Sequence, residues 1–260
     1  MHNTIIIRYS EIGLKGKNRH LFEKRLIGNI KAKIKKAKKP VIYKKRGRIY
    51  IKSEEKMPFL SHVFGISSYS HALCCKYSIE NIKECIGRIL KNRKFGSFRI
   101  TASRIDKSTK ETSNELNIAL GSYVAEKYKK KVSLKNYDIN IYIEVNEKAY
   151  VFLDKVQGKN GLPVGITGRV FCLIENKKSI SACKAIMSRG CLPVLLIKRK
   201  MKTNCLEKYA PGKIEKIKIS SKEDILKLKK SKGISSIVLQ STNGAEFFKL
   251  KSFLILVPTV

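Results

Sequence analysis

The chain has 260 residues, of which 43% are hydrophobic, so it can bury a sizeable core and is expected to form two or three compact domains rather than a disordered chain. Its 56 Lys and Arg residues exceed its 20 Asp and Glu residues, and the formal net charge of +36 favours a polyanion, above all nucleic acid, as the partner. No run approaches the ~20 apolar residues that span a bilayer, and no signal-peptide pattern opens the chain, so we expect a soluble cytoplasmic protein with no membrane partner. A Lys-rich composition bias and attraction to anionic lipid remain the alternative explanations of the charge.

The first part of the chain predicts an α+β unit. "TIII" begins a short apolar strand that breaks into a loop at Gly13 and Gly16. Helical spacing follows over residues 19–37, and its apolar positions are Leu21, Phe22, Leu26, Ile30 and Ile34. "VIYKK" and "RIYIK" then read as two strands joined at a glycine turn. The densest basic run, residues 31–40, is either a solvated face or an RNA-facing surface.

The middle of the chain repeats these themes. A short helix is expected in "PFLSHVFGI", a longer helix over 79–90 and a strand over 97–105. A helix over 112–128 opens with Thr112 or Ser113 as N-cap. Glu115 lies in capping-box position, and residues 139–156 read as a hairpin around Asn146–Glu147.

The last third alternates strand and helix. The pattern predicts a strand over 169–174, a helix over 179–189 and a strand over 191–197. The elements that follow are a strand at 213–219, a helix at 221–231, a strand at 234–240 and a final apolar run at 252–260. This alternation implies a parallel sheet with crossover helices. In such a unit the turn after the first strand is where a phosphate binds, but here residues 175–178 contain no glycine.

The seven cysteines form no C-x-x-C pair, and with four scattered histidines we expect no zinc or other metal site. Cys172, Cys183 and Cys191 fall on apolar faces and are most simply core residues. Cys205 lies outside the predicted core elements.

Four stretches resemble the tRNA 4-thiouridine synthetase (tRNA sulfurtransferase) family. "RYSEIGLKGKNRHLFEKRL" resembles the opening signature of the family, and "FRITASRIDKSTKETSNEL" and the stretch from Val132 to Gly165 resemble its RNA-binding THUMP domain. "GRV", from Gly168 onward, falls where the PP-loop domain of the family begins. The resemblance implies an α+β N-terminal half, made of a ferredoxin-like domain (1–58) and a THUMP α/β domain (59–165). A small, Rossmann-like parallel-sheet PP-loop domain (166–260) follows, and we place the boundary in the Gly-rich stretch 157–165.

The family grips tRNA with its first two domains, so the resemblance implies RNA contacts at the matching positions. Lys15, Lys17, Asn18 and Arg19 lie in a Gly-bearing loop that suits close approach to phosphates. A second group of RNA-binding candidates comprises Arg104, Lys107, Thr112 and Ser113. For both groups a solvated surface is the competing interpretation, and any recognition should depend on RNA shape and phosphate charge.

The catalytic end departs from the family pattern. The S-G-G-x-D-S loop of the family is replaced by "ENKKS", which retains only Ser179, and the T-G and S-Q pairs are missing from "LQSTNGAEFF". The vestigial nucleotide-binding positions are Leu173, Ile174, Ser179, Ile197 and Lys198. Glycine amides can wrap a pyrophosphate where Cβ atoms obstruct it, and Glu175 adds a repelling charge. Cys205 is the best candidate for a catalytic sulfur carrier, although a structural or incidental thiol is the simpler interpretation, because no second cysteine follows it.

We therefore expect a tRNA-binding protein of this family that acts in tRNA thiolation as a non-adenylating paralogue or RNA-binding subunit, with no cofactor. Its further partners would be an active thiolation enzyme or a sulfur-carrier protein, and the family suggests a homodimer. The alternative is an active ATP-dependent tRNA uridine sulfurtransferase with an atypical nucleotide loop, which would use ATP with Mg. The sequence alone leaves open whether the protein is an enzyme.

Overall fold

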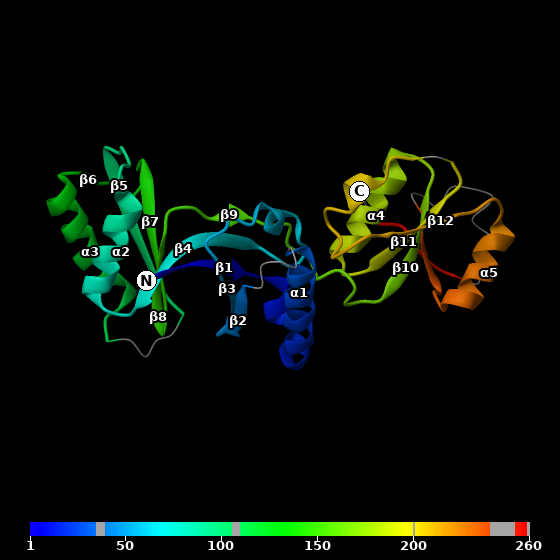
Figure 1. Cartoon of the computed structure of the whole chain (residues 1–260), viewed down its shortest axis with the longest axis horizontal. Coiled ribbons are helices and arrows are strands. Elements are labelled where there is room, and N and C mark those ends of the chain that lie inside the picture. The colour runs from blue at the N-terminus through cyan, green and yellow to red at the C-terminus, as the bar shows by residue number, and fades with distance from the viewer. Residues whose placement is uncertain (35–39, 106–109, 200, 240–252, 259–260) are drawn as a thin grey trace. The chain divides into compact units, whose positions relative to one another are not determined.

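The computed structural model describes residues 1–34, 40–105, 110–199, 201–239 and 253–258 (Figure 1). Contacts divide the chain into two compact units. The first unit comprises Met1–Arg8, Pro40–Met57 and Ser68–Val156, and the second comprises Tyr9–Lys39, Pro58–Ser67 and Gln157–Val260. Each unit is therefore built from segments that are far apart in the sequence.

The first unit is built on a mixed sheet in the strand order β2-β3-β1-β4-β8-β7-β5-β6, with β9 paired to β4. The strands are β1 (His2–Arg8), β2 (Val41–Lys45), β3 (Arg48–Lys52), β4 (Ser68–Lys76), β5 (Ser97–Arg104), β6 (Lys131–Val132), β7 (Ile139–Asn146), β8 (Lys148–Phe152) and β9 (Val156–Gln157). β1 pairs antiparallel with β3 and with β4, whereas β5 pairs parallel with β7. The predicted hairpin at 139–156 is confirmed as β7 and β8, which pair antiparallel.

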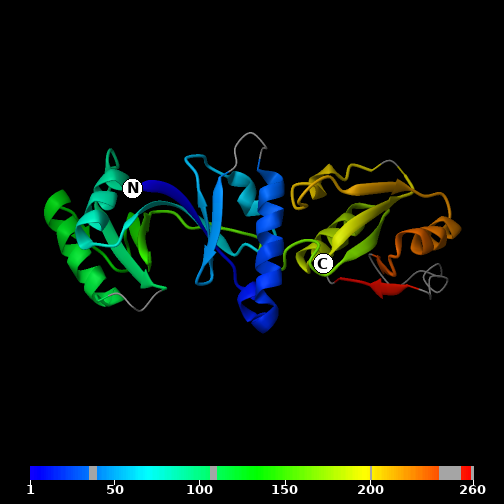
Figure 2. The same cartoon turned by 60° about the horizontal axis from the view of Figure 1, so that its bottom comes forward.

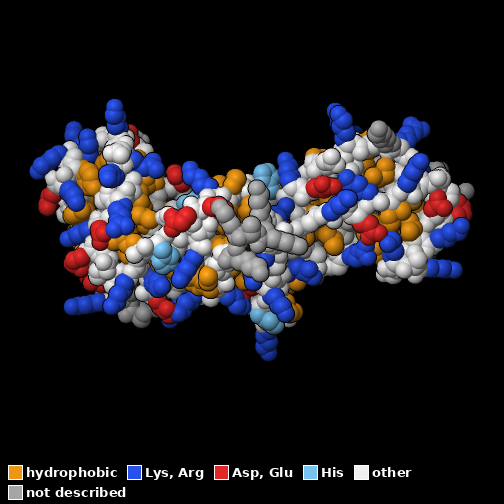
Figure 3. Space-filling view, viewed as in Figure 1, with side chains coloured by type: hydrophobic (Ala, Val, Ile, Leu, Met, Phe, Trp, Pro, Cys, Tyr) orange, Lys and Arg blue, Asp and Glu red, His pale blue; other side chains and the backbone are white. Residues whose placement is uncertain are grey.

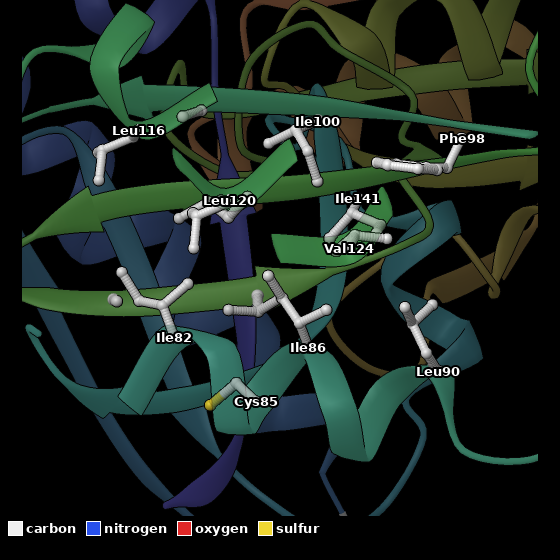
Figure 4. Close-up of a cluster of buried hydrophobic side chains, with 14 of the residues drawn as sticks. Ile82, Cys85, Ile86, Leu90, Phe98, Ile100, Leu116, Leu120, Val124 and Ile141 are labelled. Atoms are coloured by element: carbon white, nitrogen blue, oxygen red, sulfur yellow. The ribbon is translucent and has the colours of Figure 1, made fainter. Parts of the chain in front are cut away.

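Helices α2 (Ile79–Leu90) and α3 (Ser113–Tyr128) supply the apolar side chains that cover one face of this sheet. Figure 4 shows Ile82 and Ile86 of α2 and Leu120 of α3 in one cluster with side chains of the strands. The predicted capping box of α3 is confirmed, with Thr112 as N-cap and Glu115 as its reciprocal partner. Capping satisfies amides that have no partner within the helix, which fixes where the helix starts.

The other face of the sheet holds buried charges. Side chains alternate along β7, so Glu144 points away from the helix-covered cluster that contains Ile143 and Val145. Arg8 donates from Nε and Nη2 to Glu144 Oε2 at 3.0 and 2.9 Å, and Arg48 Nε donates to Glu144 Oε1 at 2.7 Å. The side chains of Arg8 and Glu144 are only 7% and 4% exposed. This charged group is therefore balanced by internal partners rather than by water.

Tyrosine rings stack beside these charges. The ring of Tyr50 lies 5.1 Å from that of Tyr43 and 4.8 Å from that of Tyr150. The guanidinium of Arg8 lies over the ring of Phe152 at 5.0 Å. Burial raises the pKa of the Tyr50 and Tyr150 hydroxyls, so both stay neutral.

The second unit contains a parallel sheet in the order β12-β11-β10-β13-β14, as the sequence predicts. Its strands are β10 (Arg169–Ile174), β11 (Leu192–Ile197), β12 (Glu215–Lys218), β13 (Ser236–Val238) and β14 (Leu254–Leu256), the last seen in red at one edge in Figure 2. Its helices are α1 (Arg19–Lys33), α4 (Lys177–Ser188) and α5 (Lys222–Lys232), with short 3-10 turns η1 (Glu11–Leu14), η2 (Gly16–Asn18), η3 (Pro58–His62) and η4 (Asn204–Leu206). Cys172 and Ile174 of β10 pack in the cluster that contains α4 residues, and Phe171 packs in the cluster that contains Ile225 of α5. The two helices therefore cover opposite faces of the sheet.

Residues 157–165, the Gly-rich stretch in which the sequence predicts a domain boundary, are packed closely within the second unit. Gly158 N donates to Ser67 O at 2.9 Å, and Asn160 N donates to Ile66 O at 2.8 Å. A Cβ on Gly158 would lie 2.2 Å from Ile66 O, so no other residue fits without moving the backbone. Leu162 N donates to Ser188 O at 2.8 Å, which ties the same segment to the end of α4.

Helix α1 is held to this segment by Asn29, whose Nδ2 donates to Val164 O at 3.0 Å. Leu26 and Ile30 are buried, but Leu21 is 47% exposed, so the apolar spacing extends beyond the buried part of the helix. An apolar residue in the first turn satisfies the helical spacing although it lies beyond the packed part of the helix. Much of the basic run 31–40 lies outside the described residues.

Among the described residues, no helix combines the length and apolar character needed to cross a membrane. Lys and Arg side chains are spread over the visible face of each unit (Figure 3). The charge of +36 is therefore carried by both units rather than by one tail.

Candidate nucleic-acid interface and nucleotide loop

The loop that precedes α1, residues 10–18, is built from two consecutive 3-10 turns. Ile12 is fully buried and anchors the loop, whereas Lys17 and Asn18 are exposed. Gly16 has a φ of +50°, in the left-handed region that other residues rarely adopt. Lys15 is half-buried, with its ammonium group 5.4 Å from the ring centroid of Phe22. The loop thus presents basic side chains on a backbone of fixed shape.

Arg19, the first residue of α1, is held by two buried residues. Its Nε donates to Glu23 Oε1 at 3.1 Å, and its Nη2 donates to Tyr9 Oη at 3.0 Å. The Tyr9 hydroxyl in turn donates to Glu23 Oε1. Burial, together with the bond to Glu23, raises the pKa of Tyr9 to about 12, so this hydroxyl keeps its proton. The Arg19 guanidinium therefore has a fixed orientation while its side chain stays 38% exposed.

The second group of predicted contacts lies in the first unit. Arg104 Nη1 donates to Glu111 O at 3.0 Å at the end of β5. The Thr112 hydroxyl accepts a hydrogen bond from Glu115 N at 3.2 Å, so it caps α3, and Ser113 is half-buried in the first turn. Lys107 lies outside the described residues. The Arg19 group and the Arg104 group thus belong to different units.

The turn between β10 and α4 is closed by the side chain of Ser179. Its Oγ accepts hydrogen bonds from Glu175 N at 3.0 Å and from Asn176 N at 3.1 Å, and donates to Asn176 O at 2.7 Å. Asn176 is the N-cap, since its Oδ1 accepts from Ser179 N at 3.1 Å. Ser179 is only 3% exposed. The amides of Glu175, Asn176 and Ser179 are therefore bonded within the turn and are not available to a phosphate.

The other predicted nucleotide positions surround this turn. Ile174 is fully buried in the core, and Leu173 and Ile197 are half-buried at the same ends of their strands. Lys198 Nζ lies 3.8 Å from Glu175 Oε1, so the carboxylate of Glu175 partly neutralises the Lys198 charge. Within the described ranges no group of three or more His, Cys, Asp or Glu residues could hold a metal ion.

Cys205 is exposed in η4, whereas Cys172 and Cys183 are buried in the core of the second unit. Burial and the neighbouring Cys183 raise the pKa of the Cys172 thiol, which keeps it protonated and inert. Accessibility alone therefore separates Cys205 from the core cysteines.

Sequence reasoning missed Tyr9, Glu23 and Asn176. The motif comparison treated Ser179 as the last remnant of a nucleotide loop, whereas Asn176 and Ser179 have the three-residue spacing of a capping box. That spacing was visible in the sequence. The contact between Tyr9 and Glu23 carried no comparable local signal.

Two family models match segments within the first three fifths of the chain. The ThiI ferredoxin-like domain model matches residues 4–70, and the THUMP domain model matches residues 76–154. Among solved structures, PH1313 from Pyrococcus horikoshii aligns with a TM-score of 0.86 at 29% identity, covering 98% of this chain and 94% of that one. A 4-thiouridine synthetase, solved as an RNA complex with bound ATP, aligns with a TM-score of 0.79 at 21% identity, covering 99% and 81%. The predicted fold class is thereby confirmed.

Curated relatives carry the name "Probable tRNA sulfurtransferase". The Finegoldia magna protein is 35% identical over 183 residues, covering 66% of this chain and 46% of that protein, and the Mycoplasmopsis synoviae protein is 39% identical over 193 residues, covering 73% and 50%. The chain thus spans about half the length of these two relatives. The Thermococcus kodakarensis protein is 33% identical over 261 residues, covering 90% of this chain and 68% of that protein. With this match over most of both proteins and a shared fold, the chain belongs to the tRNA sulfurtransferase family.

Proposed function

We propose that this family member binds tRNA in the thiolation of uridine to 4-thiouridine but does not adenylate it, and that it presents tRNA to an active thiolation enzyme or a sulfur-carrier protein. The observation that carries this proposal is the turn at residues 175–179. Three features of the turn oppose nucleotide binding together: Cβ atoms where the family has glycine, amides bonded to Ser179, and the carboxylate of Glu175.

The RNA-binding part of the proposal rests on the basic loop at residues 10–18 and on the charge of +36. One solved relative is described as an RNA complex with bound ATP, and RNA is the part of that description that we carry over to this chain. We place the grip in residues 1–165, divided into a ferredoxin-like domain (1–58) and a THUMP domain (59–165), and assign residues 166–260 to a degenerate PP-loop domain. Cys205 then has no required catalytic role.

Calorimetric titration of the full chain with ATP and Mg²⁺, with and without tRNA, tests the missing nucleotide site. We expect no heat of specific ATP binding under either condition, because the amides of Glu175, Asn176 and Ser179 are already bonded within the turn and it lacks the glycines of a phosphate-binding nest. A saturable heat of ATP binding would contradict this proposal and favour an active, ATP-dependent enzyme.

The rival function, an active sulfurtransferase, is favoured by one observation: Lys177 and Lys178 are exposed at the start of α4, where they could attract phosphate. Incubation with ATP, tRNA and a persulfide sulfur donor separates the two functions. We expect no thiouridine. Product that disappears in a Lys177→Ala/Lys178→Ala variant would establish the rival.

The contacts of Arg19 predict that removal of an acidic side chain weakens the binding of tRNA. Glu23→Gln removes a negative charge, so bulk electrostatics alone predicts tighter binding of tRNA. We expect weaker binding instead, by about fivefold, since the Arg19 guanidinium loses the carboxylate that orients it. Fluorescence anisotropy with labelled tRNA measures the affinity.

Glu84→Gln is the matched control for this experiment. Glu84 forms the same kind of i,i+4 pair with Arg88, but both side chains are more than half exposed. We expect its affinity for tRNA to stay at the wild-type value or rise slightly. Equal behaviour of the two variants would mean that Glu23 does not position Arg19 for RNA.

A further inference from the structure

Side chains from five separate segments of the second unit gather at Tyr209 and at its neighbours His62 and Lys208. We call this cluster the Tyr209 patch, and its members are Tyr209, His62, Lys33, Lys159, Lys184 and Lys208. Lys184 Nζ and Lys208 Nζ lie 5.1 and 5.2 Å from the centre of the Tyr209 ring. The imidazole of His62 lies 5.8 Å from the same ring. One ring therefore holds two ammonium groups in place.

Lys33 and Lys159 extend the positive charge around this ring. Lys33 Nζ donates to Lys208 O at 2.9 Å, which joins the end of α1 to the segment after η4. Burial, together with Lys208, Lys159 and Lys33, lowers the pKa of His62, so the imidazole is largely neutral at pH 7. Lys159 thus adds a positive charge near His62 from a fifth segment, residues 157–165.

Carboxylates do not neutralise the patch. In the part of the chain that the structure describes, none of its four lysines forms an ion pair. The nearest acid in sequence, Glu207, instead pairs with Lys216 at 3.0 Å. Lys159, Lys184 and Lys208 are exposed. Mutual repulsion of these ammonium groups destabilises the surface until an anion binds.

The arrangement fits a phosphate backbone better than a single small anion. The lysines flank the largely buried Tyr209 instead of converging on an enclosed cavity, so they can contact successive phosphates. Lys184 follows Lys177 by seven residues on α4, which is about 10 Å along the helix axis. The patch is therefore separate from the turn at residues 175–179.

We propose that the Tyr209 patch is a second RNA-binding surface, which contacts phosphates of tRNA independently of the nucleotide turn. This inference rests on the proposed tRNA-binding function and extends it to the C-terminal part of the chain. It gives residues 166–260 a role in RNA binding without ATP.

The test is a Lys184→Ala/Lys208→Ala variant of the full chain, compared with a Lys227→Ala/Lys230→Ala variant. The control lysines are exposed on α5 of the same unit and remove the same charge. Affinity for a tRNA transcript is measured by anisotropy over a series of salt concentrations. We expect the patch variant to bind about tenfold more weakly and to lower the salt slope by about 1.5 to 2, because two phosphate contacts are lost. We expect the control to change little.

Equal affinities and slopes for the two variants, with wild-type protein that binds tRNA, would overturn the patch and leave the proposed function intact. Wild-type protein that does not bind tRNA would overturn both. Thermal unfolding of each variant detects misfolding. If the patch variant is destabilised, Lys184→Gln/Lys208→Gln keeps the long side chains and must show the same reduced salt slope.

Discussion

Glu144→Ala is expected to lower the free energy of unfolding of the first unit by about 3–5 kcal/mol. Glu144 is the carboxylate between Arg8 and Arg48, and its removal leaves the buried Arg8 guanidinium without a counter-charge. Urea unfolding followed by near-UV circular dichroism measures the change. The chain has no Trp, so the stacked Tyr43, Tyr50 and Tyr150 provide a signal close to the substitution.

Glu147→Ala is the control on the same hairpin. Glu147 pairs with Lys45, but both side chains are more than two fifths exposed, so its loss should cost less than about 1 kcal/mol. We further expect Arg8→Met/Glu144→Leu to be more stable than Glu144→Ala alone, because it also removes the buried Arg8 charge and leaves only Arg48, whose side chain is 23% exposed, without its carboxylate. If the double variant is less stable than Glu144→Ala, the attraction between Arg8 and Glu144 stabilises the fold by itself, and the cost of an unpaired buried charge does not explain the loss.

Gly158→Ala is expected to lower the free energy of unfolding of the second unit by about 3 kcal/mol. Its Cβ would lie 2.2 Å from the backbone oxygen of Ile66, and backbone cannot yield as a flexible side chain does. The substitution must separate residues 66–67 from 158–160 and break the two hydrogen bonds that join them. Urea unfolding followed by far-UV circular dichroism measures the loss.

Gly212→Ala is the matched control for this change. No atom lies within 4 Å of where its Cβ would be, so we expect the stability to be unchanged or raised by up to about 1 kcal/mol. Similar losses for the two variants would contradict the packing explanation, since of these two glycines Gly158 alone faces a backbone atom.

The local structure was largely predictable because its causes are local. The alternation of apolar residues located β7 and β8, and the Thr112–Glu115 spacing located the start of α3. The parallel sheet of the second unit followed from the order of its elements. Leu21 shares the helical spacing of Leu26 and Ile30 but is exposed, because periodicity gives the face of a helix and not the length over which that face is packed.

Contacts between distant residues were not predictable in this way. Arg8 and Glu144 are separated by 136 positions, and the sequence around either residue does not identify its partner. The structure of the turn at residues 175–179 was predictable in part. The missing glycines were evident in the sequence, but the closure of the turn by the Ser179 hydroxyl required the structure. The Tyr209 patch brings five segments together and was not anticipated.

The joint between α1, residues 58–67 and residues 157–260 constrains how this protein can change over evolutionary time. Phe64 and Val164 share a core with Val170, Cys172 and Tyr209, and Asn29 bonds to Val164. A gene shortened before β10 would uncover that core and yield an aggregation-prone product. Point changes at residues 175–178, which are exposed, remove little packing and escape that penalty. The sequence of residues 175–178 can therefore change more freely than the length of the chain.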